Sequence, residues 1–349
     1  VGVFSWCSAL TKADLSQVAI TEIPANTFAY AGVDVVTDDL GNASEKAVLT
    51  SVKFNDAVTS LGDNCFMASG LITLDLSSTN ITSIGDGAFS SCEYLQQITL
   101  GNITEMGDYV FDGLAVTRPV LRSVTFGSGS TALGAGAFRG QRNLSTLTLA
   151  EGQKNVKTIG AYTFAYCAKL TNIQKFESIT ETYLDSENKE KTLYRIGIGD
   201  YAFYKSSLKV EGTLAISLAE GAGIGEGAFA ATAGINDFAI TSDDGKYEVV
   251  DGMIVENVAN GKEVLAYASL GKSGKITVPE KTVRIGASVF ENVTDATEVE
   301  FPYELKAIGD KAFYGCGATK YVFGGINAPV LEATYVAASD FDEKSDLYK

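Results

Sequence analysis

Ile84-Gly85-Asp86-Gly87-Ala88-Phe89 is the stretch from which the rest of the chain can be interpreted. Cys92, Leu95, Ile98 and Leu100 follow it, so the pattern reads Ile-Gly-x-x-Ala-Phe-x-x-Cys-x-x-Leu-x-x-Ile-x-Leu. Further copies begin at Leu61-Gly62, Met106-Gly107, Leu133-Gly134, Ile159-Gly160, Ile198-Gly199, Ile224-Gly225, Ile285-Gly286 and Ile308-Gly309, with degenerate copies at Ile23-Pro24 and at Phe4-x-x-Cys7-x-x-Leu10. A period of about 23 residues, lengthened by insertions, indicates a repeat protein that grows along one axis.

Each repeat predicts a coil with two walls and a turn. The run Leu95-x-x-Ile98-x-Leu100 ends in a strand, and Ile81-x-x-Ile84 returns along the opposite wall. Stacked coils place equivalent strands side by side in a parallel sheet. We expect Gly85 to permit a turn that a side chain would hinder. Asp86 is then placed to cap a short helical turn, and the repeat phenylalanines should stack as an internal ladder.

Longer gaps between repeats mark insertions. Residues 32–47 extend the second coil, and residues 177–195 are strongly polar and predict an exposed loop. Residues 241–270 contain two apolar runs around Asp251-Gly252 and Asn260-Gly261, which indicate an inserted β-hairpin. We expect residues 324–349 to cap the last coil. The prediction is one domain over residues 1–349, a repeat solenoid that is mainly β with short helical turns and parallel stacked strands.

The charge and hydropathy of the chain exclude several classes of partner. Among 349 residues, 27 are Lys or Arg and 43 are Asp or Glu, which gives a net charge of −16. Nucleic acid and anionic lipid both require a basic surface, so neither is an expected partner. No apolar run reaches 18 residues, so we expect no insertion into a membrane. Because the chain begins at Val1 within a repeat, we expect it to be a trimmed or mature product.

The cysteines follow the repeat. Four of the five (Cys7, Cys92, Cys167 and Cys316) come three residues after a repeat phenylalanine, and Cys65 precedes Phe66. Equivalent positions in coils that are not adjacent lie too far apart for a disulfide. We therefore expect five free, buried thiols that act as small hydrophobic side chains.

The residues offer little catalytic chemistry. The chain has no histidine, which removes Ser-His-Asp and Cys-His systems and histidine-ligated zinc. Residues 221–227 are rich in glycine but lack the Lys and Ser/Thr of a phosphate-binding loop. We predict no enzyme activity and no catalytic, cofactor or metal residues. The acidic groups at Asp38/Asp39, Asp243/Asp244, and Asp340, Asp342, Glu343 and Asp346 are interpreted as solvated loop residues, with calcium binding or glycoside cleavage as alternatives.

The outward side of the predicted sheet is the candidate binding surface. Its central row is expected to contain Lys53, Asp75, Thr99, Thr125, Thr148 and Gln174, with Glu300 further along. A broad, regular face suits a protein or an extended polymer. Alternatively, threonine is there because it suits solvent-facing strands. Aromatic residues outside the core, Tyr30, Tyr94, Tyr183, Tyr194 and Tyr204, either anchor a partner or pack over the coil edges.

The repeat pattern resembles the BspA-type leucine-rich repeat of bacterial surface proteins. The run from Tyr247 to Val255, Tyr-x-Val-x-Asp-Gly-x-x-x, is similar to a hairpin found within such arrays, and the resemblance covers roughly residues 1–335. It implies a secreted or surface-attached protein, and several members are thought to bind host matrix or other cells. Departures occur at Pro24 and at the cysteine position, and we expect them to weaken individual coils. The cysteine is replaced by Ser69, Leu114, Gln141, Ser206, Thr232 and Val293.

We therefore expect a non-enzymatic, monomeric module, extracellular or at the cell surface, that adheres to a host matrix or cell-surface protein. One alternative is a structural spacer that holds another domain away from the cell envelope, which an attached domain in the complete reading frame would favour. Another is a glycan-binding or glycan-cleaving module. That alternative requires a cleft with aromatic platforms and two carboxylates, and the sequence shows no such cluster.

Overall fold

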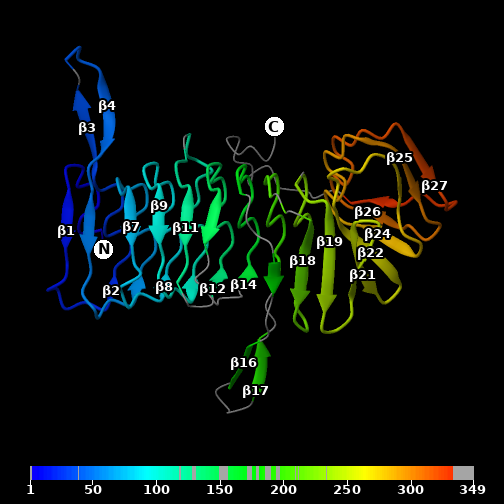
Figure 1. Cartoon of the computed structure of the whole chain (residues 1–349), viewed down its shortest axis with the longest axis horizontal. Helices are drawn as coiled ribbons and strands as arrows, with labels where there is room; N and C mark the ends of the chain where they lie inside the picture. Colours follow the sequence, from blue (N-terminus) through cyan, green and yellow to red (C-terminus); the bar gives the residue numbers. More distant parts are fainter. Residues whose placement is uncertain are drawn as a thin grey trace.

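The protein is an elongated stack of coils, shown in Figure 1 with its long axis horizontal. The structure is a computed structural model. It describes residues 2–37, 39–117, 119–127, 131–148, 156–170, 175–177, 181–184, 190–193, 197–208, 210, 212–232 and 234–332. Over these ranges the chain forms strands and hydrogen-bonded turns and no helix, so none of the described segments is a helix able to span a membrane.

One strand from each coil forms a first wall. These strands are β1 (Lys12–Asp14), β5 (Ser51–Lys53), β7 (Thr73–Asp75), β9 (Gln97–Thr99), β11 (Ser123–Thr125), β13 (Thr146–Thr148), β15 (Lys175–Glu177), β18 (Thr213–Leu218) and β19 (Asp237–Ser242). They pair in parallel as β1-β5, β7-β9-β11-β13 and β15-β18-β19. In β11 the middle residue, Val124, is fully buried, and its two neighbours face outward. The predicted parallel stacking is confirmed.

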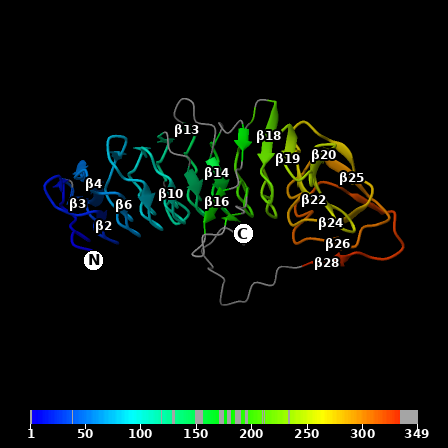
Figure 2. The ribbon, with the colours of Figure 1, turned by 90° about the horizontal axis from the view of Figure 1, so that it is seen from below.

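The opposite side of the coils is a second wall, and it too is a parallel sheet. Its strands are β2 (Glu22–Ile23), β6 (Ser60–Leu61), β8 (Ser83–Ile84), β10 (Glu105–Met106), β12 (Thr131–Leu133) and β14 (Val156–Ile159). Parallel bridges continue it from Ile159 to Ile198 and from Ile198 to Ile224. Seen from below in Figure 2, β6, β10 and β14 follow one another in sequence order along the stack.

The turn after each repeat glycine is not helical. Asn64, Phe66 and Ala68 donate their N–H groups to carbonyls of the next coil, at 2.8 Å each, whereas the amides between them donate to the carbonyl three residues earlier. Asn64 and Ala68 have φ values of 54° and 51°, which a right-handed helix does not allow. The predicted short helical turns are therefore wrong, because alternate amides are used to bind the next coil.

The repeat aspartates also act between coils. Oδ1 of Asp63 accepts a hydrogen bond from the N–H of Asp86 (2.9 Å), and Oδ1 of Asp86 accepts one from the N–H of Asp108 (2.8 Å). Oδ1 of Asp108 continues the series to the N–H of Ala135 (2.7 Å). The prediction that Asp86 caps a helical turn is wrong, because its carboxylate instead satisfies a backbone donor of the following coil.

The repeat glycines are required by the approach of the neighbouring coil. A Cβ at Gly199 would lie 2.4 Å from the backbone nitrogen of Ala161, and a Cβ at Gly107 would lie 2.4 Å from Oδ1 of Asp86. Neither glycine has a positive φ. Their role is thus to let two backbones touch, and not to supply an unusual turn as predicted for Gly85.

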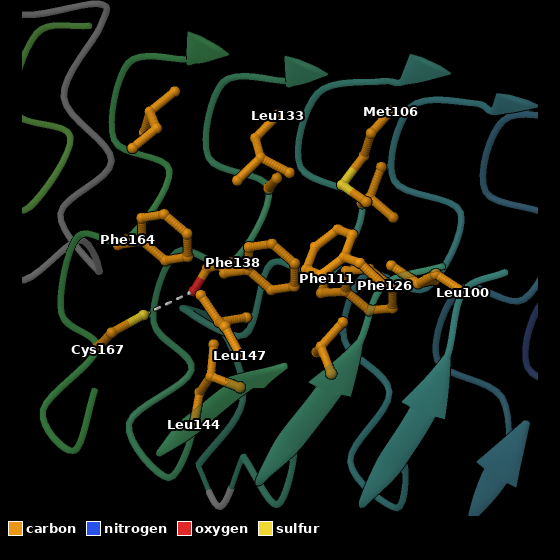
Figure 3. Close-up of a cluster of buried hydrophobic side chains, with 14 of the residues drawn as sticks. Leu100, Met106, Phe111, Phe126, Leu133, Phe138, Leu144, Leu147, Phe164 and Cys167 are labelled. Carbon is orange, nitrogen blue, oxygen red and sulfur yellow. Dashed lines mark hydrogen bonds between the residues drawn. The ribbon is translucent and has the colours of Figure 1, made fainter. Parts of the chain in front are cut away.

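The repeat phenylalanines form the predicted ladder in the core. From Phe4 to Phe229, consecutive rings stack with centroids between 5.0 and 5.5 Å apart. Figure 3 shows part of this row at Phe111, Phe138 and Phe164. The ladder is then interrupted. It resumes with Phe290, which packs at a tilt on Tyr267 before stacking on Phe313 at 5.1 Å.

An antiparallel insertion fills the interruption. The hairpin predicted within residues 241–270 is a three-stranded meander of β20 (Tyr247–Val250), β21 (Met253–Val258) and β22 (Gly261–Tyr267). Strand β22 then pairs in parallel with β24 (Thr282–Ile285), which is followed in that sheet by β26 (Ala307–Ile308) and β28 (Val330–Leu331). The other sheet in this region is β23 (Gly274–Thr277), β25 (Ala296–Phe301) and β27 (Lys320–Phe323).

The meander separates two hydrophobic cores. Ile254 and Leu265 belong to the core of the coils before it, whereas Val255 and Val264 belong to the core of the coils after it. We call residues 2–242 the first array and residues 274–332 the second array. The continuous apolar run Met253-Ile254-Val255 is explained by burial on both faces.

Two further insertions are also hairpins. Residues 32–47 contain β3 (Val33–Thr37) paired with β4 (Ala43–Ala47), and residues 177–195 contain β16 (Glu181–Leu184) paired with β17 (Glu190–Leu193). Figure 1 shows the two hairpins projecting to opposite sides of the stack. The first was predicted as a coil extension and the second as a polar loop. Of the predicted cap, residues 333–349 lie outside the described residues.

In several coils the side chain at the cysteine position donates a hydrogen bond to a carbonyl of the preceding coil. Sγ of Cys92 donates to the carbonyl of Phe66 (3.1 Å), and Sγ of Cys167 donates to the carbonyl of Phe138 (3.2 Å; Figure 3). Burial raises the pKa of Cys92 to about 11, so its sulfur keeps the proton. Gln141 and Thr232 donate to the equivalent carbonyls, each at 2.7 Å. They therefore replace the thiol with a stronger donor instead of leaving the position empty.

All five cysteines are free, as predicted, but they are not all buried. Cys65, Cys92 and Cys167 are buried, Cys7 is exposed and Cys316 is half-buried. The expectation of five buried thiols fails because Cys7 and Cys316 lie in the first and last described coils, where a neighbouring coil covers only one side.

Candidate functional site

The structure brings most of the predicted binding row together on the first wall. Asp75, Thr99, Thr125 and Thr148 face one another in register across β7, β9, β11 and β13. Asp75 and Thr148 are exposed, and the two threonines between them are half-exposed. Lys53 lies in the separate β1-β5 sheet, where it pairs with Asp14 at 3.6 Å. Gln174 lies outside the described residues.

A second polar row runs parallel to the first on the same strands. It consists of Thr73, Gln97, Ser123 and Thr146, which are also in register. Hydrogen bonds from the side chain and the backbone of Ser77 hold the pKa of Asp75 below its usual range, so Asp75 is charged at neutral pH. The two rows form a band of hydroxyl and amide groups with one carboxylate at its N-terminal edge.

A hollow of about 540 Å³ lies at the N-terminal end of the first array. It is lined by Trp6, Ser8, Tyr30, Val33, Val35, Glu45, Ala68, Ser91, Glu93, Tyr94, Ala115 and Val116. We call it the aromatic groove. Its walls come from the turns of the first coils, from the β3–β4 hairpin and from the loop that carries Tyr94. Figure 1 shows that hairpin rising beyond the coils at this end.

The aromatic wall of the groove occupies a recurring position in the repeat. Trp6 and Tyr30 each lie two residues after a repeat phenylalanine, with φ values of 63° and 59°. Other coils also have a positive φ at this position, with side chains of every size: Ala68, Ser91, Gly140, Tyr166, Lys205, Ala231, Asn292 and Gly315. A bulky residue in this conformation costs about 1–2 kcal/mol relative to glycine. The indole and phenol rings stack with centroids 4.1 Å apart, and 71% of Trp6 is nevertheless exposed.

The groove carries negative charge. Glu45 on β4 and Glu93 beside Tyr94 are its charged lining residues, and both are exposed. Burial, together with these two carboxylates, raises the pKa of Tyr94. None of the lining residues is basic. The groove therefore combines aromatic side chains with two carboxylates and no basic lining residue.

The acidic groups predicted as loop residues do not converge on a metal site where they are described. Asp244 accepts a hydrogen bond from the N–H of Lys246 (3.2 Å) and pairs with its ammonium group (3.2 Å). Asp39 is exposed near the tip of the β3–β4 hairpin. No three acidic or cysteine side chains gather as metal ligands within the described ranges. Asp38, Asp340, Asp342, Glu343 and Asp346 lie outside those ranges.

Comparison with known proteins identifies the repeat. The model of the BspA type leucine-rich repeat region matches residues 42–119, 118–209 and 264–330, which together are more than half of the chain. The chain belongs to the BspA-type leucine-rich repeat family. No curated protein sequence matches it.

Solved structures share the fold of this BspA-type array. A leucine-rich cell surface protein from Faecalibacterium prausnitzii is similar with a TM-score of 0.58 and 21% identity, over 90% of this chain and 69% of that one. The pneumococcal vaccine antigen PcpA is similar with a TM-score of 0.42 and 16% identity, over 87% of this chain and 56% of that one. A leucine-rich repeat protein from Eubacterium ventriosum is similar with a TM-score of 0.43 and 19% identity, over 76% of this chain and 56% of that one. At 21% identity the first similarity extends to the fold alone.

Sequence reasoning missed the aromatic groove of this BspA-type chain. Tyr30 and Tyr94, predicted as possible anchors, do line it, whereas Tyr204 is buried between the two arrays. The side chains of Tyr183 and Tyr194 lie outside the described part of the structure. The sequence shows no cluster of aromatic residues and carboxylates because folding brings these residues together from separate coils. A repeat alignment offers one signal, since Trp6 and Tyr30 are aromatic residues at the same position of consecutive coils.

Proposed function

We propose that this chain is a non-enzymatic module, extracellular or at the cell surface, that adheres to a protein partner through the first wall of its first array. The observation that carries the proposal is the register of Asp75, Thr99, Thr125 and Thr148 beside a second polar row. Adjacent strands lie about 4.8 Å apart, so these four residues span about 14 Å on one face. Such a face presents many weak hydrogen-bonding groups to a large surface.

The shape of this surface favours a macromolecular partner. Small-molecule sites are concave and enclose most of the ligand, whereas the two polar rows lie on an open sheet. Protein interfaces bury hundreds of Å² on each partner and tolerate a polar periphery. The net charge of −16 favours a basic partner surface and an association rate that falls with salt.

Membership of the BspA-type family supports the location outside the cell. The similar protein from Faecalibacterium prausnitzii is described as a cell surface protein, which agrees with this proposal. A host matrix protein or a cell-surface protein is the proposed partner, and the chain is proposed to act as a monomer.

Binding of the purified chain to immobilised matrix proteins, mucin and bacterial surface proteins tests the proposal. A Thr99→Lys/Thr125→Lys variant places two charges in the middle of the predicted row and should weaken binding at least about tenfold. The matched control is Thr82→Lys/Thr104→Lys, which adds the same charges at exposed positions of the second wall. Absence of binding to every surface would remove the adhesion proposal, and equal loss in both variants would remove the first wall as the site.

A further inference from the structure

We propose that the aromatic groove binds a lysine or arginine side chain from a segment of a protein partner. The cation would lie against the rings of Trp6, Tyr30 and Tyr94, with Glu45 and Glu93 as its counterions. The groove is distinct from the polar rows of the first wall, so this inference stands independently of the proposed function.

The lining of the groove provides the two kinds of group that bind a cation, aromatic rings and carboxylates. Tyr94 supplies one aromatic ring, and Trp6 and Tyr30, which cover one face of each other, supply two more. A π face attracts a cation most strongly in the case of tryptophan. Glu45 reaches the groove from the hairpin, and Glu93 reaches it from the loop beside Tyr94. The effect of both carboxylates on the pKa of Tyr94 agrees with their being close to its ring. Val33 and Val35 add apolar surface for the methylene groups of the guest side chain.

The chain contains an internal example of the same arrangement. The guanidinium of Arg139 lies 4.8 Å from the centroid of the Tyr109 ring. It also donates two hydrogen bonds to Asp112, from Nε to Oδ1 (3.0 Å) and from Nη2 to Oδ2 (2.9 Å). One cation is thus held between an aromatic face and a carboxylate. The groove offers the same groups, but its lining contains no lysine or arginine.

Cations of the chain also lie near other tyrosine rings. Lys205 lies 5.0 Å from the Tyr204 ring, and Lys272 lies 5.5 Å from the Tyr267 ring. No such pair within the described residues includes Trp6, Tyr30 or Tyr94. The rings of the groove therefore have no cation of the described part of the chain against them and remain available to one from another molecule.

The charge of the groove decides between possible occupants. An acidic ligand would be repelled by Glu45 and Glu93. A neutral oligosaccharide can stack on the rings, but it leaves two carboxylates without a counterion. A basic side chain satisfies the rings and the carboxylates together, and a hollow of about 540 Å³ has room for it and for its flanking backbone.

Trp6 makes the test direct, because it is the only tryptophan in the chain. Its fluorescence can be followed while the full chain is titrated with capped alanine pentapeptides that carry one central lysine, arginine, glutamine or glutamate. A neutral cellohexaose titration covers the oligosaccharide alternative. We expect a saturable change with the lysine and arginine peptides that weakens with added salt, and none with the glutamine or glutamate peptides.

Substitutions test whether the fluorescence change of Trp6 comes from binding in the groove. Glu45→Gln/Glu93→Gln removes both counterions and should weaken binding of the lysine peptide about tenfold, and Tyr94→Ala should weaken it similarly. Glu22→Gln/Glu105→Gln makes the same change of charge at exposed positions of the second wall and should leave binding unchanged. All variants keep Trp6 as the probe, and circular dichroism confirms that each is folded.

Several results would overturn the proposal. These are no saturable change with either basic peptide, an equal change with the glutamine peptide, an equal effect of both glutamate pairs, and a response to cellohexaose alone. The first-wall variant Thr99→Lys/Thr125→Lys leaves the groove intact and should not alter the response. Failure of this proposal is therefore distinguishable from failure of the first-wall proposal.

Discussion

The hydroxyl of Tyr204 donates a hydrogen bond of 2.9 Å to Oε1 of Glu291, across 87 residues of sequence. Tyr204 belongs to a turn of the first array, and Glu291 follows Phe290 in the second array. Glu291 is only 3% exposed, and its Oε2 has no hydrogen-bond partner among the described residues. A cavity of about 40 Å³ beside it has room for a water molecule. This contact joins the two arrays where the phenylalanine ladder is interrupted.

Tyr204→Phe should therefore loosen the second array. The substitution keeps the ring but removes the donor from a buried carboxylate, which should cost about 1.5–3 kcal/mol of unfolding free energy. Hydrogen exchange followed by mass spectrometry should show faster exchange in residues 282–313 than in the middle of the first array. Tyr303→Phe, at a side chain that is 65% exposed, is the matched control and should change little. Equal effects of the two variants would contradict this role for Tyr204.

The same junction predicts sensitivity to alkali. Burial, with a contribution from Tyr162, raises the pKa of Tyr201 to about 12, and burial together with Glu291 raises that of Tyr204. An unfolded tyrosine loses its proton near pH 10. Between about pH 10 and 12 the unfolded chain has fewer bound protons than the folded chain, so the stabilisation present below pH 10 is lost as the pH rises.

Urea denaturation at pH 8, 10 and 11 measures this loss. We expect the midpoint to fall between pH 10 and 11 in the unmodified chain and to fall less in Tyr201→Phe, which has one fewer tyrosine to titrate. A midpoint that is constant over this range would show that both tyrosines ionise alike in the folded and unfolded states. An equal fall in both proteins would show this for Tyr201.

The solenoid was predictable because its determinants recur within one repeat. The spacing of Ile84, Phe89 and Leu95 predicts which side chains are buried in the core of a coil, and all three are buried. Contacts between coils were not predictable in the same way. The role of Asp63 depends on an amide one period later, whose distance is fixed only after the coils stack. The helical turn was a wrong prediction for this reason.

The aromatic groove was beyond prediction for a related reason. Trp6, Glu45 and Glu93 are dozens of residues apart, and the direction of the β3–β4 hairpin decides whether they meet. The sequence shows an insertion at residues 32–47 but not where it points. The polar row on the first wall needs only the stacking of identical coils, which explains why most of it was anticipated.

Gly199→Ala should destabilise the chain more than Gly286→Ala, although both glycines occupy the same position in the repeat. At Gly199 the new Cβ would lie 2.4 Å from the backbone nitrogen of Ala161, which cannot move independently of its coil. At Gly286 the nearest atom is the carbonyl oxygen of Val264 at 3.1 Å, because the meander replaces the preceding coil. We expect about 1–3 kcal/mol for Gly199→Ala and less for Gly286→Ala in urea denaturation. The reverse order would contradict the backbone contact as the reason for the glycine.

Arg284 is a second link between the arrays. Its guanidinium contacts Glu226 of the first array, Glu263 of the meander (3.5 Å) and Glu332 at the end of the described chain (2.8 Å). Removal of the cation leaves three carboxylates close together. Because the site is half-buried, Arg284→Met should cost about 1–3 kcal/mol, between the values for surface and buried pairs. Lys306→Met is the exposed control, and the difference between the variants in thermal melts should shrink at high salt.

The phenylalanine ladder predicts an effect that depends on position along the stack. Phe164 is 1% exposed and lies between Phe138 and Phe203, with ring centroids 5.5 and 5.4 Å away. Phe164→Ala should cost about 3–5 kcal/mol, because it leaves a cavity in a core that the neighbouring coils cannot close.

Phe4 lies at the other extreme of the same ladder. It is half-buried and stacks only on Phe28 among the described rings, at 5.2 Å, so Phe4→Ala should cost much less. Each coil is stabilised by its two neighbours, and a central defect therefore weakens two interfaces whereas a terminal one weakens a single interface. Hydrogen exchange should show the central defect spreading in both directions from residue 164. Equal losses in thermal melts of the two variants would contradict the nearest-neighbour account of this fold.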